Sequence, residues 1–152
     1  MNQKRKLYFE KDASIYPISP VYDEKGFSGF LRSDNIIELD MKDGYSFSVE
    51  DGYAMLDVLK KISGNQKFPL IVFYAYDNLF SRETRELIAR HDLTVADALV
   101  GVGTPLIMIA NFYLNINRPK RPTKYFSNEP AALEWLKQFK KQSSEAVISQ
   151  GK

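Results

Sequence analysis

Residues 95–139 read VADALVGVGTPLIMIANFYLNINRPKRPTKYFSNEPAALEWLKQF, and this stretch decides the fold class. It holds two successive units in which an apolar strand run leads into a helical run. The first unit predicts a buried strand over 96–102 and a helix over 104–117. The second predicts a short strand over 123–126 and a helix beginning at Asn128, whose apolar residues recur at i, i+3, i+4 and i+7. Alternating strands and helices predict parallel pairing with right-handed crossovers.

The preceding half of the chain supplies the remaining elements. The runs FSGFLR and NIIELDM predict an antiparallel hairpin, and FPLIVFYAY over 68–76 predicts a central strand buried on both faces. Ser48 with Asp51 has capping-box spacing for a helix that ends at Gly64, and Ser81 is the predicted N-cap of a helix through about Arg90. The predicted fold is therefore an α/β (α+β) layered sandwich, with a mixed, mainly parallel sheet of about five strands and four helices in the order ββαβαβαβα.

A chain of 152 residues suits one domain with a proper core. We predict an N-terminal extension over 1–26, a single domain over 27–140 and a disordered tail over 141–152. The residues that fall on buried strand runs or inward helix stripes form the predicted core: Leu70, Val72, Leu99, Val100, Trp135 and Leu136.

Composition excludes several classes of function. The net charge of +2 comes from 21 basic and 19 acidic residues, so no global field attracts nucleic acid or anionic membranes. The absence of cysteine excludes disulfides and thiolate chemistry and fits a cytoplasmic setting. The N-terminus meets charged residues where a signal peptide needs an apolar core. As a helix the uncharged run 104–117 rises only about 21 Å, too short to span a bilayer.

The order of elements, the strand FPLIVFYAY, the pair ADALVGVGTPLIMIANFYLNINRP and the ending PTKYFSNEPAALEWL resemble small bacterial proteins of the SpoIIAA-like, STAS-like type over about residues 27–140. The resemblance implies a cytoplasmic regulatory or interaction module, since relatives act as anti-sigma factor antagonists, transporter-attached regulatory domains or binders of lipids and small ligands. Phosphorylated antagonists carry an Asp-Ser-x-Gly turn after the equivalent strand. Here Asp77 and Ser81 lie near that place at a different spacing. They are the switch candidates that the resemblance implies, and capping is the role that the sequence predicts for Ser81.

No arrangement of residues indicates an enzyme, a cofactor or a metal. His91 is the only histidine, and Gly101-Val102-Gly103 lacks the third small residue of a dinucleotide loop. A hydrolase or isomerase using Asp77, Ser81 and His91 has no supporting spacing. We therefore expect a non-enzymatic protein without cofactor or metal.

Two features suggest binding. Arg118, Lys120, Arg121 and Lys124 place four positive charges in seven residues, and with the predicted helix cap Thr104 they form a candidate anion contact. The alternative is an ordinary exposed basic loop, and nucleic acid is disfavoured because no aromatic residues alternate with the basic ones.

The second feature is the helix over 104–117, which is apolar on all sides. It predicts docking of a protein partner or a homodimer through Met108, Phe112 and Tyr113, or cover by residues 1–26. The alternative is a lipid or other small apolar ligand beneath the helix, with an anionic group held by the basic loop.

Overall fold

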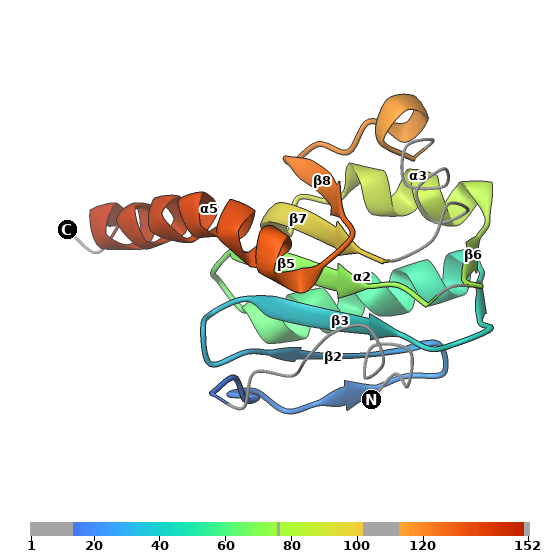
Figure 1. Cartoon of the computed structure of the whole chain (residues 1–152), viewed down its shortest axis with the longest axis horizontal. Helices are drawn as coiled ribbons and strands as arrows, with labels where there is room; N and C mark the ends of the chain where they lie inside the picture. The colour runs from blue at the N-terminus through green and yellow to red at the C-terminus, as the bar shows by residue number, and fades with distance from the viewer. Residues whose placement is uncertain (1–13, 76, 102–112, 151–152) are drawn as a thin grey trace.

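The computed structural model describes residues 14–75, 77–101 and 113–150 (Figure 1). Its elements are, in chain order, β1 Tyr22–Asp23, β2 Phe27–Leu31, β3 Ile37–Met41, β4 Ser46–Phe47, α2 Val49–Ser63, β5 Phe68–Phe73, β6 Leu79–Phe80, α3 Arg82–Arg90, β7 Thr94–Val100, the π-helix η1 Tyr113–Asn117, β8 Thr123–Phe126 and α5 Glu129–Gln150.

The main sheet has six strands in the order β1-β2-β3-β5-β7-β8. The pairs β1–β2 and β2–β3 are antiparallel, and the three remaining pairs are parallel. The predicted mixed, mainly parallel sheet is therefore confirmed. Two features go beyond the prediction: the two-residue β1 at the edge, and a separate two-stranded sheet formed by β4 and β6.

Helix α2 follows its capping signals. The Ser48 side chain accepts from the Asp51 N–H while the Asp51 carboxylate accepts from the Ser48 N–H, so the predicted capping box is confirmed. The helix ends at Gly64, whose φ of 58° lies in the left-handed region that glycine adopts at little cost.

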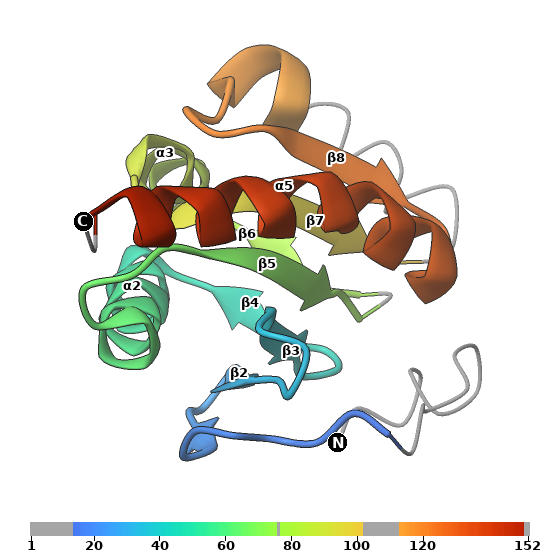
Figure 2. The ribbon, with the colours of Figure 1, turned by 90° about the vertical axis from the view of Figure 1, so that its left-hand side faces the viewer.

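The sheet separates two hydrophobic cores, because alternate residues of a strand point to opposite faces. Leu70 and Val72 of β5 pack towards α2 and α3, while Ile71 and Phe73 pack towards α5. Figures 1 and 2 show α5 on one face of the sheet and α2 on the other. The prediction that β5 is covered on both faces is confirmed.

Trp135 differs from its predicted burial, whereas the other five predicted core residues are buried. Its ring lies at the margin of the α5 core against Phe126 and Phe139, with centroid distances of 5.5 and 4.8 Å, and remains partly exposed. Ala132 and Leu136 occupy the centre of the α5 stripe. The i, i+3, i+4 pattern identifies the buried face of a helix and does not distinguish its centre from its margin.

The described part of the extension lies beside β2. Pro17 bridges to Arg32, the Ile18 N–H donates to the Leu31 carbonyl, and β1 pairs with β2. This edge is opposite to the β8 edge in the strand order, and η1 lies beyond β8 in Figure 1. Residues 14–26 therefore extend the sheet on the side away from η1.

Helix α5 continues to Gln150, into the segment for which the sequence predicted a disordered tail. Residues 141–150 contain neither glycine nor proline, so their composition is compatible with a continuous helix. Among the described residues, no helix combines the length and the apolarity that crossing a bilayer requires.

Candidate functional site

Helix α3 carries the residues of the candidate site. Ser81 is its N-cap, as predicted, because its side chain accepts from the Thr84 N–H at 3.2 Å. The helix buries Thr84 and Ala89 against the domain. Arg82, Glu86 and Arg90 follow one another at intervals of four residues, so they lie along one face of the helix.

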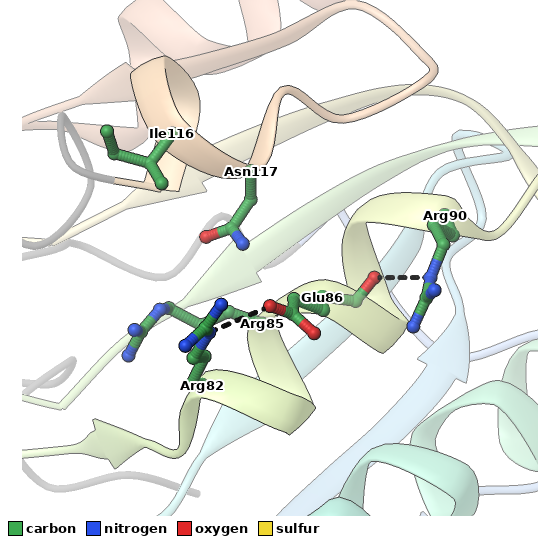
Figure 3. A pocket seen from close by; sticks show the side chains of 6 residues that line it. All are labelled: Arg82, Arg85, Glu86, Arg90, Ile116 and Asn117. Atoms are coloured by element: carbon green, nitrogen blue, oxygen red, sulfur yellow. Dashed lines mark hydrogen bonds and ion pairs between the residues drawn. The ribbon is translucent and has the colours of Figure 1, made fainter.

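A pocket of about 510 Å³ lies between this face and the π-helix η1 (Figure 3). We name it the arginine pocket, and its lining residues are Arg82, Arg85, Glu86, Arg90, Ile116 and Asn117. Its volume is within the range of small-ligand sites, about 300 to 1,000 Å³. Three guanidinium groups and one carboxylate leave the lining with an excess of positive charge.

The hydrogen bonds within the described residues position these arginines and leave donors available. Arg82 Nε donates to Glu86 Oε1 at 3.0 Å, and Arg90 Nε donates to the Glu86 carbonyl at 3.2 Å. Arg85 Nη1 donates to the Phe80 carbonyl at 2.7 Å, which fixes this side chain beneath the helix start. Only Nε of Arg82 and of Arg90 is engaged in these bonds. Their planar outer edges therefore suit a carboxylate or phosphate, which guanidinium binds through paired N–H donors.

A second polar group of the same region is buried. We name Thr94, Asp97 and Arg121 the buried arginine centre. Arg121 Nε donates to Asp97 Oδ2 at 2.7 Å, and the side chains are only 4% and 3% exposed. The other carboxylate oxygen accepts from the Thr94 hydroxyl at 2.5 Å.

Arg121 also holds the end of α3. Its Nη1 donates to the carbonyls of Ile88, Ala89 and His91 at 2.8, 3.1 and 3.2 Å. These carbonyls lack intrahelical partners, and a cation beside them is favoured by the helix dipole. The buried arginine centre therefore connects the carboxyl end of α3 to β7 and to the loop before β8.

Burial dominates the electrostatics around this centre. Removal from water, assisted by the positive charge of Arg121, lowers the pKa of His91 to about 4. His91 Nδ1 accepts from the Leu93 N–H at 3.1 Å, which places the ring proton of the neutral form on Nε2. Burial likewise raises the pKa of Tyr113 to about 12.

A cavity of about 30 Å³ adjoins the centre, lined by apolar core residues together with His91, Asp97, Tyr113 and Arg121. Among the described residues, Tyr113 Oη and Arg121 Nη2 are buried without a hydrogen-bond partner. A volume of this size holds about one water molecule. It does not accommodate a lipid chain.

The structure distributes the predicted site residues among different environments. Arg118 and Lys120 are exposed, whereas Arg121, which the sequence grouped with them as a candidate anion contact, is buried and pairs with Asp97. Tyr113 is 8% exposed and packs in the core of its own domain, so its ring is not presented to a partner. Thr104, Met108 and Phe112 lie outside the described residues, and docking through them stays a prediction. Of the two switch candidates, Ser81 is the N-cap described above, and Asp77 accepts from the Gly44 N–H at 2.7 Å.

Sequence reasoning missed the arginines of α3. Their spacing was a signal, since Arg82, Arg85 and Arg90 fall on neighbouring positions of one helix surface. The opposite wall of the pocket, η1, gives no such signal in the sequence, because it is a π-helical segment whose approach to α3 depends on tertiary packing. Within the described residues, no three His, Cys, Asp or Glu side chains gather as a metal site.

Comparisons with known proteins agree with this architecture. A family model described as a domain of unknown function, DUF7793, matches residues 30–140. A solved structure of an uncharacterised DUF3478 protein with a SpoIIAA-like fold from Shewanella loihica PV-4 is 14% identical, with a TM-score of 0.50 over 80% of this chain and 93% of that one. The fold is therefore SpoIIAA-like, as the sequence resemblance implied.

A protein of unknown function from Arthrobacter sp. FB24 is 27% identical over 71% of this chain and 96% of that one, with a TM-score of 0.29. No curated protein matches the chain.

Proposed function

The chain belongs to the DUF7793 family of unknown function, and we propose that it is a non-enzymatic module that binds a small anionic ligand in the arginine pocket. One observation carries the proposal: three arginines line a single pocket of ligand size beside only one carboxylate. The ligand's anionic group is a carboxylate or a phosphate, the two groups that the guanidinium fork recognises in the same geometry.

Arg82 and Arg90 are the proposed ligand-contacting residues. Arg82 is 79% exposed at its side chain, and Arg90 is also exposed. An exposed arginine that serves only stability contributes little, about 0 to 1 kcal/mol for a surface ion pair. Two such side chains directed at one hollow are therefore better accounted for by a bound anion than by stabilisation of α3.

We also propose that the protein has no enzymatic role. His91, the only histidine of the chain, faces the buried arginine centre and does not line the arginine pocket, and burial lowers its pKa to about 4, away from neutral pH. The pocket lining offers arginines, one glutamate, an asparagine and an isoleucine. This set positions and neutralises an anion but contains no nucleophile paired with a base.

The test is calorimetric titration with inorganic phosphate and with acetate at low ionic strength. We expect saturable binding of at least one of them, weakened about tenfold in the double variant Arg82→Ala/Arg90→Ala, since the pocket then offers the anion neither exposed guanidinium group. The single changes Lys60→Ala and Lys137→Ala serve as controls, because each removes one exposed positive charge outside the pocket lining. Equal losses in the controls would show attraction by net charge alone, and absence of saturable binding to the parent protein would refute the proposal.

A further inference from the structure

Glu86 is the unexpected member of the arginine pocket. It lies four residues after Arg82 and four before Arg90, and Figure 3 shows its carboxylate between the arginine side chains. One oxygen, Oε1, accepts from Arg82 Nε at 3.0 Å, and no hydrogen bond among the described residues engages Oε2. The side chain is 40% exposed, so it is accessible from the pocket.

Through Oε1 the Glu86 carboxylate positions Arg82, but its negative charge disfavours a ligand that is only an anion. Glu86 repels any anionic group that contacts Arg82 or Arg90, because like charges one helical turn apart interact unfavourably. A strand of nucleic acid laid along the three arginines would carry phosphates past this carboxylate. The composition of the lining therefore disfavours a polyanion.

We propose, resting on the function proposed above, that the ligand carries an anionic group together with an ammonium or N–H donor group that pairs with Glu86. The anionic group contacts the outer guanidinium nitrogens of Arg90, and the donor group contacts Glu86 Oε2. These two anchor points are four residues apart on α3, a rise of about 6 Å, so a short linker joins the two groups of the ligand. Ile116, which is 63% exposed, supplies an apolar wall for that linker.

Two probes that differ only in the donor group test this assignment. They are 2-aminoethyl phosphate and ethyl phosphate, titrated calorimetrically into the full chain. We expect the parent protein to bind the amino compound about fivefold more tightly, the value of one partly exposed ion pair of about 1 kcal/mol.

The variant Glu86→Gln should abolish this preference. It removes the negative charge, so ethyl phosphate should bind about two- to fivefold more tightly while the preference for the amino compound disappears. Glu83→Gln is the matched control, because it makes the same change on the same helix outside the pocket lining, and it should preserve the preference.

The outcomes separate the two proposals. Equal or tighter binding of ethyl phosphate by the parent protein overturns this inference and leaves the anion-binding function standing. A preference that persists in Glu86→Gln overturns it as well, by placing the donor elsewhere. If neither probe nor inorganic phosphate binds, the anion-binding function itself is wrong and the inference falls with it. The comparison of the two probes on the parent protein requires no variant, so it holds even if Glu86→Gln folds poorly.

Discussion

Arginines at two places around α3 have opposite environments. Arg121 is 6% exposed and directs its guanidinium to Asp97 and to three carbonyls at the end of the helix. Arg82 and Arg90 use only Nε within the described residues and present the rest of the guanidinium to a pocket. A buried arginine is retained only when its donors are nearly all satisfied, whereas an exposed one can exchange water for a ligand. The buried arginine centre therefore supports the fold, and the arginine pocket is the place for binding.

The largest expected effect comes from removing the buried cation. Arg121→Met keeps much of the apolar stem but leaves Asp97 as an uncompensated buried charge and frees the carbonyls at the end of α3. We expect a loss of about 3 to 5 kcal/mol in the free energy of unfolding, measured by urea denaturation.

Arg90→Met is the matched control, and it should change stability by less than about 0.5 kcal/mol because its side chain is exposed. A loss below 1 kcal/mol for Arg121→Met would contradict the structural role of Arg121 and would reopen it as a ligand contact.

The next effect is a pH dependence caused by His91, the only histidine. Its folded-state pKa of about 4 lies below its ordinary value of 6.5, so the unfolded chain binds the proton first. Stability from the neutral imidazole is fully present above about pH 6.5 and is lost as the pH falls towards 4. The loss should approach about 3 kcal/mol, since each pKa unit corresponds to about 1.4 kcal/mol.

His91→Asn tests this by urea denaturation between pH 7 and pH 4. Asparagine offers an acceptor near the place of Nδ1 for the Leu93 N–H but does not titrate. We expect a flatter pH profile in this variant. An unchanged slope between pH 6.5 and pH 5 would assign the acid sensitivity to carboxylates and contradict the burial of a neutral His91.

The parts of this arrangement that the sequence predicts are those with local causes. The capping signals of Ser48 and Ser81 and the apolar run of β5 lie within single elements, and each prediction was confirmed. The pairing of Arg121 with Asp97 joins residues 24 positions apart, so no local pattern distinguishes Arg121 from its exposed neighbour Lys120.

To predict the arginine pocket, one needs both the local spacing of residues and the tertiary contacts between distant segments. The arginines of α3 share a helix surface by spacing alone. Their opposite wall is η1, where the sequence predicts the end of a helix over 104–117 and the structure has a π-helix. Packing over a distance therefore decides which basic residues are buried and which face a hollow.

A smaller effect is expected at the N-cap of α3, which holds the first turn at the arginine pocket. Ser81→Ala removes the acceptor for the Thr84 N–H and should cost about 1 kcal/mol, while Ser81→Asp should cost little because aspartate also caps. Urea denaturation measures both. If Ser81→Asp is as destabilising as Ser81→Ala, the hydroxyl contact with Thr84 Oγ1 at 2.6 Å matters more than the cap.

The smallest effect on intrinsic stability, and the sharpest contrast with Arg121, is expected at Arg90. In buffer free of phosphate, Arg90→Ala should unfold within about 0.5 kcal/mol of the parent protein. Phosphate at ten times its dissociation constant should stabilise the parent by about 1.4 kcal/mol, because a ligand that binds only the folded state adds RT ln(1 + [L]/Kd).

Phosphate also stabilises proteins generally by exclusion from their surfaces, and this contribution is common to all variants. The difference between the parent and Arg90→Ala therefore isolates the site, and we expect it to be about 1 kcal/mol. Lys137→Ala should retain the full gain. If phosphate stabilises Arg90→Ala as much as it stabilises the parent, the guanidinium group of Arg90 does not bind phosphate. The proposed contrast between a structural Arg121 and a ligand-binding Arg90 would then be wrong for Arg90.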